Sequence, residues 1–234
     1  MTMSETGRPR QIPLALGHKP ALGRDDLIVT PANAEAVSMI DRWPDWPSAV
    51  MVLAGPAGSG KSHLASIWRE WSGAESVLAE ELGGMAAAPA GPVLVDGVGD
   101  GPFDEAALFH LLNMVRSAGT HLLLTSRRFP LAWGAELPDL VSRLRTATTV
   151  EVHEPDDALL EGVIAKLFAD RQVEVEPHVV SYLARRIERS VATAIDVVER
   201  LDRAALEEKS RITRGLAARI VSALDEGQGA LPFP

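Results

Sequence analysis

The sequence predicts an α/β protein in which a parallel β-sheet covered by helices is followed by a smaller all-helical part. Three observations predict this organisation. Short apolar runs alternate with amphipathic segments of helical period through the first two thirds of the chain. Only amphipathic helical segments recur after Pro155. The 234 residues are also enough for one large domain or two small ones, with a sizeable core.

Four apolar runs predict buried strands, because strands that are covered on both faces are apolar throughout. They lie at 50–54, 92–96, 121–125 and 148–152. Three amphipathic stretches predict helices, at 31–42, 61–71 and 104–117. The first of these begins with Pro31, a residue type that is favoured in the first turn of a helix.

The rest of the chain divides into an arm, a helical domain and a tail. Residues 1–26 hold several prolines and glycines without a sustained period, and we expect a mobile arm there. We expect the sheet domain at 27–154 and the helical domain at 155–226, with helices at 156–170, 176–187, 191–207 and 213–224. The last residues, 227–234, are expected to form a frayed tail.

Composition excludes several classes of protein. The chain has no cysteine, which excludes a disulfide framework, a zinc ribbon and thiol catalysis. No apolar run approaches the roughly 18 residues of a membrane span, and the polar first residues lack a secretory signal, so we expect a cytoplasmic protein without membrane contact. The formal net charge of −9 argues against nonspecific nucleic-acid binding, although a local basic patch stays possible.

The eight residues that directly follow the first predicted strand match the phosphate-loop pattern G-x-x-x-x-G-K-[S/T]. They are Gly55, Pro56, Ala57, Gly58, Ser59, Gly60, Lys61 and Ser62. Glycines let the backbone curl so that its N–H groups point at phosphate oxygens, and the following helix adds its positive dipole end. We expect Lys61 to reach the β- and γ-phosphates and Ser62 to bind Mg²⁺. The loop therefore predicts ADP or ATP with Mg²⁺ as cofactor.

An acidic residue at the end of a neighbouring strand is the second component that such a site needs. Asp96 ends the second apolar run and is expected to hold the magnesium shell through water, although a strand-terminal Asp that makes a turn is the plain alternative. The next residue, where ATPases of this kind often carry a second acid, is Gly97. Without a group that positions water, nucleotide binding is expected to persist while hydrolysis is slow.

The phosphate loop continues as His63-Leu64, and this run resembles that of the bacterial replication initiator DnaA and its relatives among the AAA+ ATPases. The stretch from Asp26 to Ala36, which holds Leu27 and Ile28, is similar to the family's adenine-wrapping segment, and the strand with Thr125 is similar to its sensor-one strand. The resemblance covers about 26–224. It implies a five-stranded AAA+ core with a helical lid, and nucleotide contacts from Leu27, Ile28, His63 and Thr125.

The segment 137–144 resembles the family's segment that ends in an arginine finger, which implies that Arg143 enters a neighbour's nucleotide site. An ordinary surface arginine is the alternative to this role, and Arg145 is the competing residue for it. The family also places a sensor-two arginine early in the third lid helix. Here Ala192 stands in that position and Arg189 lies one turn earlier, so either Arg189 contacts nucleotide or the function is absent.

The chain is similar to an initiator without its DNA-reading domain, because it ends soon after the lid. That is the description of the Hda-type regulatory inactivators of DnaA, and it implies no direct sequence-specific DNA binding. Gln11, Leu14 and Leu16 resemble the peptide with which partners bind the β sliding clamp. Two leucines can insert into an apolar groove while the glutamine hydrogen-bonds at its rim. An arm that packs on its own domain is the alternative.

The function that we expect from this resemblance is negative control of replication initiation. The clamp tethers the protein, nucleotide maintains its fold, and Arg143 completes hydrolysis of DnaA-bound ATP. Two alternatives stay open: an autonomous P-loop ATPase or loader, against which Gly97 counts, and a clamp-tethered, nucleotide-dependent anchor without effect on DnaA. A homo-oligomer is also possible.

Overall fold

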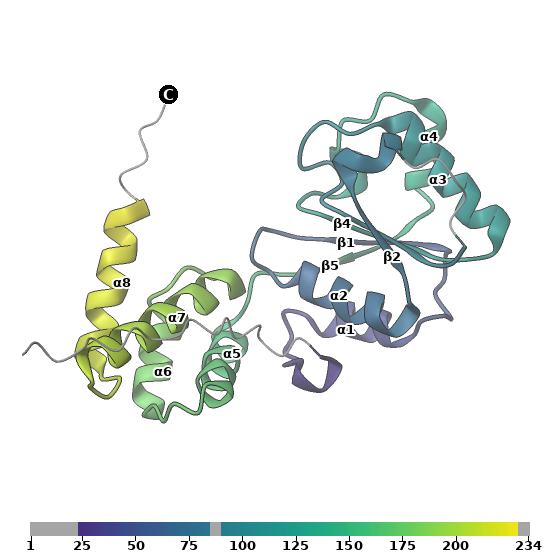
Figure 1. Cartoon of the computed structure of the whole chain (residues 1–234). Helices are drawn as coiled ribbons and strands as arrows, with labels where there is room; N and C mark the ends of the chain where they lie inside the picture. The colour runs from purple at the N-terminus through teal and green to yellow at the C-terminus, as the bar shows by residue number, and fades with distance from the viewer. Residues whose placement is uncertain (1–22, 85–89, 229–234) are drawn as a thin grey trace, which may run out of the picture.

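The computed structural model describes residues 23–84 and 90–228, and Figure 1 shows two bodies, a sheet-containing core and a helical lid, joined by the segment after β5. The core holds a five-stranded parallel sheet in the order β2-β3-β4-β1-β5. Its strands are β1 (Val50–Ala54), β2 (Glu75–Leu78), β3 (Val93–Asp96), β4 (Leu122–Ser126) and β5 (Thr148–Glu151). The predicted α/β fold with a parallel sheet and a helical lid is confirmed.

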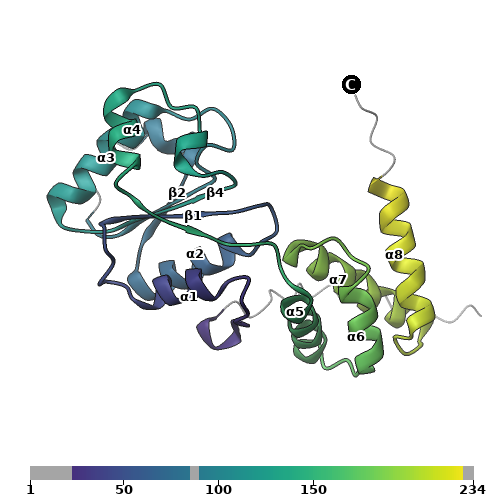
Figure 2. The same ribbon diagram turned by 180° about the vertical axis from the view of Figure 1, so that it is seen from behind.

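Helices cover both faces of this sheet, as the opposite views in Figures 1 and 2 show. The core helices are α1 (Ala34–Asp41), α2 (Lys61–Ser72), α3 (Glu105–Ala118) and α4 (Pro138–Leu144), with short 3₁₀ turns η1 (Arg24–Asp26), η2 (Ala79–Gly84) and η3 (Pro130–Ala132). Because side chains alternate along a strand, Val52 packs with α3 and α4, whereas Met51 and Leu53 pack with α1 and α2. The result is a three-layer core.

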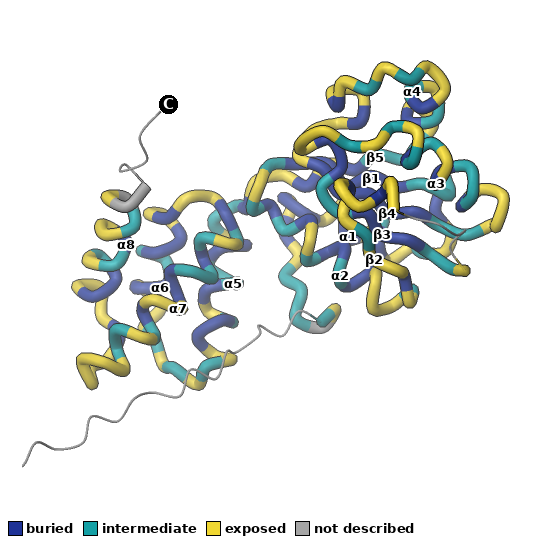
Figure 3. The backbone as a smooth tube through the Cα atoms, turned by 45° about the horizontal axis from the view of Figure 1, so that its top comes forward, coloured by how far each residue is buried: buried dark blue, intermediate teal, exposed yellow. Residues whose placement is uncertain are grey.

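The lid has a hydrophobic core of its own, which Figure 3 shows as a second buried region beside that of the sheet. Its helices are α5 (Asp157–Asp170), α6 (Pro177–Ala184), α7 (Val191–Glu208) and α8 (Arg214–Gln228). Asp156 and Ser190 cap α5 and α7, because each side chain accepts a hydrogen bond from a backbone N–H in the first turn of its helix.

The hydrophobic runs predict four of the five strands and do not predict β2. β2 lies at the edge of the sheet beside β3, and three of its four residues are exposed. An edge strand of this kind carries no continuous apolar run, so the pattern that identifies buried strands does not detect it. The five-stranded sheet was implied by the family resemblance and not by the hydrophobic pattern.

Candidate functional site

The phosphate loop lies at the carboxyl end of β1, between that strand and the start of α2. β1 is flanked by β4 and β5, so the loop lies where connections leave the sheet in opposite directions, the usual ligand position in open α/β sheets. Gly58 and Gly60 have φ of +74° and +97°, a conformation that L side chains rarely adopt. Gly60 is also the N-cap of α2 and has no side chain to cap its N–H groups, which leaves these groups for an anion.

Lys61 is buried within this loop, with 8% of the residue exposed. Its ammonium donates hydrogen bonds to the carbonyls of Gly55 (2.7 Å) and Pro56 (2.6 Å). Burial lowers the pKa of Lys61, and the carboxylates of Asp100 and Asp96 oppose this lowering of the pKa. A buried cation held by neutral carbonyls suits a polyphosphate ligand, because an anion would offset the cost of its desolvation.

Asp96 and Thr125 meet at the same edge of the sheet. β3 and β4 pair with Val95 opposite Leu124, so the next residue of each strand is again a neighbour. The Thr125 hydroxyl donates a hydrogen bond to the Asp96 carboxylate and accepts one from the backbone N–H of Gly97 (3.0 Å). The structure thus brings together the acidic residue and the sensor-one threonine that the sequence proposed separately.

Asp100 is a charged residue of this site whose contacts the sequence did not predict. Its carboxylate accepts a hydrogen bond from the backbone N–H of Arg127 (2.9 Å) and pairs with the Arg127 guanidinium (3.2 Å). Asp100 is also the foremost carboxylate acting on the pKa of Lys61. The loop after β3 therefore supplies an acidic group near the phosphate loop, although Gly97 itself has no side chain for that purpose.

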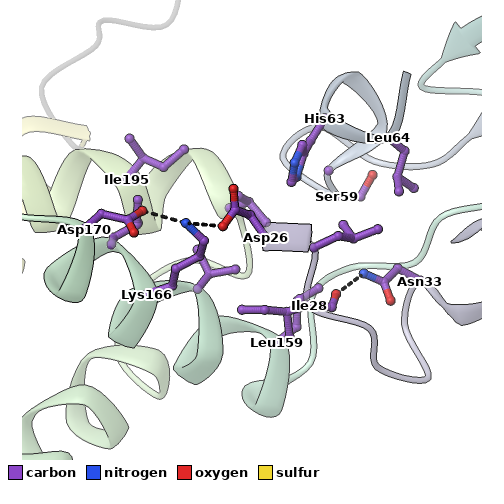
Figure 4. A pocket seen from close by; sticks show the side chains of 15 residues that line it. Asp26, Ile28, Asn33, Ser59, His63, Leu64, Leu159, Lys166, Asp170 and Ile195 are labelled. Carbon is purple, nitrogen blue, oxygen red and sulfur yellow. Dashed lines mark hydrogen bonds and ion pairs between the residues drawn. The ribbon is translucent and has the colours of Figure 1, made fainter. Parts of the chain in front are cut away.

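A pocket beside the phosphate loop is enclosed by the segment before α1, the start of α2 and the lid (Figure 4). Leu27, Ile28 and His63, which the resemblance implied as nucleotide contacts, all line it together with Ser59 and Gly60. The lid contributes apolar side chains from α5 and α7: Leu159, Val163, Leu167, Val191 and Ile195. A mostly apolar pocket that opens beside a phosphate loop has the chemistry of a base-binding site.

Buried Asn33, 6% exposed, holds the core's segment of this pocket in place. Its side-chain amide donates to the Ile28 carbonyl (2.8 Å), and its side-chain oxygen accepts from the Thr30 N–H (2.9 Å). These two bonds fix the backbone next to Leu27 and Ile28. Asn33 thus lines the pocket and also holds this segment in place.

The lid touches the phosphate loop directly at the start of α7. The backbone N–H of Val191 donates to the Gly58 carbonyl (2.9 Å). Arg189, the candidate for the sensor-two role, instead pairs with Asp157 (2.8 Å) and donates to the Pro155 carbonyl (3.2 Å). Neither Arg189 nor Ala192 is among the described residues that line the pocket beside the phosphate loop. In this structure the lid meets the phosphate loop through this backbone hydrogen bond and through Ser190, which packs against Gly58.

Arg143 lies far from this pocket, in the last turn of α4. It lines a second hollow, of about 410 Å³, together with Arg116 and the residues that lead into the amino end of β1. Within the described part of the chain, no ion pair is formed by the Arg143 guanidinium. Arg145, the competing residue, is exposed and does not line this hollow.

Several expectations fall outside these observations. Gln11, Leu14 and Leu16 lie outside the described residues. Among the helices that the structure describes, none is both long and apolar enough to span a membrane. Over the same residues, His, Asp and Glu side chains form no group of three or more that could hold a metal ion, so Ser62 and Asp96 would need nucleotide oxygens to complete a magnesium shell.

Sequence and structure comparisons place these features among known proteins. Residues 163–218 match the family model of the Hda lid domain. An uncharacterized protein of Haemophilus influenzae is 26% identical over 119 residues, which cover 50% of this chain and 52% of the relative. The chromosomal replication initiator protein DnaA of Flavobacterium psychrophilum is 25% identical over 117 residues, 50% of this chain and 24% of the relative. The chain thus matches about half of the first relative's length and about a quarter of the second's.

The solved structures with this fold include replication initiators and a DNA motor. Domain III of Thermotoga maritima DnaA has a TM-score of 0.77 at 16% identity and covers 87% of this chain and 97% of that one. AMPPCP-bound DnaA from Aquifex aeolicus has a TM-score of 0.63 at 17% identity, and the match covers 76% of this chain and 64% of that one. The RuvB Holliday junction branch migration motor of Thermotoga maritima has a TM-score of 0.70 at 15% identity, and the match covers 88% of this chain and 72% of that one.

The phosphate loop, the strand order and these neighbours define the class: a P-loop protein with the AAA+ fold. The lid narrows the assignment within that class. Residues 163–218 match the Hda lid domain, and the chain is similar in sequence and fold to DnaA-related proteins.

Proposed function

We propose that this protein is a negative regulator of replication initiation that binds adenine nucleotide and stimulates ATP hydrolysis by DnaA in trans. The position of Arg143 carries the proposal. It lies beside the amino end of β1, whereas the phosphate loop begins at the carboxyl end of that five-residue strand. At about 3.3 Å per residue the two are separated by about 17 Å, which puts Arg143 out of reach of its own nucleotide.

Arg143 has the properties of a group that acts on another molecule. A guanidinium in a hollow that contains a second arginine and no acidic side chain is suited to anionic groups of a partner. Arginine fingers supplied in trans raise phosphoryl-transfer rates by about 10³–10⁵-fold, because they stabilise charge on the transferring phosphoryl group. In this proposal DnaA is the ATPase and the present chain is its activator.

The protein's own nucleotide has a structural and not a hydrolytic role in this proposal. Lys61 and the N–H groups at the start of α2 would hold the phosphates, and Leu27, Ile28 and the lid would enclose the base. Bound Mg²⁺, held at Ser62 and through water at Asp96, would neutralise phosphate charge. Gly97 places no second acid beside Asp96, which favours retention of the nucleotide over turnover.

Clamp binding through Gln11, Leu14 and Leu16 completes the proposal. A short peptide that orders on binding has modest affinity, because it loses conformational entropy. Tethering to a clamp on DNA then raises the effective concentration of the protein near DnaA. The same arm would serve the alternative anchor function, in which DnaA hydrolysis is unaffected.

The test is a reconstitution in which DnaA loaded with ATP, clamp on DNA and this protein are mixed, and ATP hydrolysis is measured with each component omitted in turn. We expect hydrolysis to need all three. Arg143→Ala should lose the stimulation while it folds, binds nucleotide and binds the clamp as wild type does. Arg143→Lys should restore little, because an ammonium cannot contact two phosphate oxygens in a fixed fork.

Arg145→Ala is the matched control, since Arg145 lies two residues on and outside the hollow. Stimulation that survives in Arg143→Ala but not in Arg145→Ala would assign the arginine-finger role to Arg145. Stimulation that survives in both would refute activation in trans and favour the anchor. Steady turnover of ATP by the purified chain alone would favour the autonomous ATPase.

A further inference from the structure

Three charged side chains form a network at the edge of the base pocket. The Lys166 ammonium, on α5, lies 2.7 Å from the Asp170 carboxylate and 3.2 Å from the Asp26 carboxylate, as the dashed lines in Figure 4 show. All three residues line the pocket. Asp170 belongs to the same helix as Lys166, four residues on, whereas Asp26 ends η1 in the segment that leads into α1.

The Asp26–Lys166 contact connects the core to the lid, because η1 is fastened to the core independently. The guanidinium of Arg24, in η1, forms a two-point ion pair with Asp41 at the end of α1, at 2.8 and 2.5 Å. The lid approaches the same segment at Gly162, where an added Cβ would lie 2.9 Å from the Cδ1 of Ile28. The base pocket is therefore bounded by a fixed core segment and by α5, with Lys166 bridging the two.

A second core–lid contact lies at the other end of the site, where the Val191 N–H meets the Gly58 carbonyl. The lid is thus fastened on both sides of the nucleotide position: by a backbone hydrogen bond at the phosphate loop and by an ion pair at the base. The backbone bond involves no side-chain charge. The ion pair does, and it is the fastening that a substitution or added salt can weaken selectively.

We propose that Asp26 and Lys166 form an ionic clasp that closes the lid over the base and sets how long the protein retains its nucleotide. The inference rests on the proposed nucleotide binding. It adds a role for Asp26 and Lys166 as the pair that controls nucleotide release. A nucleotide whose base lies in this pocket leaves when the lid moves away from the core segment. That movement breaks the Asp26–Lys166 contact, so the contact slows release.

The environment of the clasp supports a measurable effect. The Lys166, Asp26 and Asp170 side chains are 23%, 33% and 31% exposed, so solvent screens their charges less than those of a fully exposed pair. The hydrogen bond to Asp170, together with that to Asp26, raises the pKa of Lys166 although burial opposes it. The ammonium is therefore charged at neutral pH.

Two substitutions separate bridging from a general loss of charge. Asp26→Asn and Asp170→Asn each remove one carboxylate from the same ammonium and keep the side chain's size. Asp26→Asn weakens the link between core and lid, whereas Asp170→Asn weakens a pair within α5 and leaves the link in place. Asp170→Asn is therefore the matched control.

The measurement is the dissociation rate of fluorescently labelled ADP, chased with excess unlabelled ADP in a stopped-flow instrument at low and high salt. We expect Asp26→Asn to release ADP about tenfold faster than wild type, a change of about 1.4 kcal/mol in the barrier, since removing one partner of a close charge pair acts mainly on dissociation. Asp170→Asn should accelerate release less than Asp26→Asn does, because the pair that it removes lies within α5. High salt should accelerate release from wild type more than from Asp26→Asn, because both keep the phosphate contacts and only wild type has the clasp.

The possible results distinguish the clasp from the function on which it rests. If wild type binds ADP and Asp26→Asn releases it at the wild-type rate, the clasp is refuted and nucleotide binding stands. Equal acceleration in both variants also refutes the clasp, because the effect is then one of charge and not of bridging. Failure of wild type to bind ADP overturns both proposals. Melting curves without nucleotide, expected to agree within about 2 °C, exclude misfolding of either variant.

Discussion

The contact between the phosphate loop and the lid can be tested with two glycines of the same loop. Gly58 and Gly60 both have left-handed backbones, with φ of +74° and +97°. A Cβ added at Gly58 would lie 2.1 Å from the Oγ and 2.7 Å from the Cβ of Ser190, at the start of the lid helix α7. A Cβ added at Gly60 would meet nothing within 4 Å.

The two alanine substitutions therefore differ in one cost. Both are destabilised by about 1–2 kcal/mol because an L residue occupies the left-handed region. Gly58→Ala adds the cost of overpacking against Ser190, typically about 1–3 kcal/mol. We expect Gly58→Ala to lower the free energy of unfolding by about 1–3 kcal/mol more than Gly60→Ala does.

Urea unfolding followed by tryptophan fluorescence measures this difference, and hydrogen exchange of the Val191 amide reports on the contact itself. In Gly58→Ala, the Val191 N–H should lose the protection that the Gly58 carbonyl confers. Ser190→Gly in the same chain should restore most of the extra loss, because it removes the clashing atoms and costs only a few tenths of a kcal/mol as a cap. Equal destabilisation by the two alanines would refute a lid that rests on this loop.

Two further predictions concern the nucleotide and the arm. Lys61→Ala should abolish the rise in melting temperature that Mg·ADP gives wild type. That rise corresponds to a stabilisation of about 2.7 kcal/mol when the ligand concentration is about 100 times Kd. Equal calorimetric binding of ADP by both proteins would contradict the phosphate-loop assignment. Changing Gln11, Leu14 and Leu16 together to Ala should abolish binding to the sliding clamp in a pull-down and leave the melting temperature unchanged, with Leu22→Ala as the control. A large drop in melting temperature would instead show that the arm packs on its own domain.

The sequence predicts most of the fold because the strands that matter most are buried. β1, β3 and β4 lie inside the sheet and each contains a run of at least three apolar residues, so the hydrophobic pattern alone identifies them. Helix ends are less accurate. The helix expected at 176–187 ends at Ala184, followed by Arg185 in a helical conformation as its C-cap, because apolar spacing continues into the turn that follows.

The candidate site divides in the same way between local and long-range features. The phosphate loop is contiguous in the chain, so its residues, and Asp96 at a strand end, can be proposed from the amino-acid sequence alone. The Asp100–Arg127 pair and the Lys166–Asp26 pair join residues that are 27 and 140 positions apart, and neither follows a spacing rule. Asn33 lies within the segment that resembles the base-wrapping stretch, but its hydrogen bonds to the Ile28 and Thr30 backbone depend on how that segment folds back on itself.

The arrangement of Arg143 and the phosphate loop bears on the choice of partner. The two lie at opposite ends of β1, so under the proposed role of Arg143 each molecule would carry both halves of a head-to-tail contact. Contacts of this heterologous kind join copies into rings or open chains unless another partner takes one half. If Arg143 acts in trans, a second copy and DnaA compete for the same arginine. Effective stimulation of DnaA then requires an interface that favours DnaA over self-association, and this preference must come from residues around the Arg143 hollow and not from Arg143 itself.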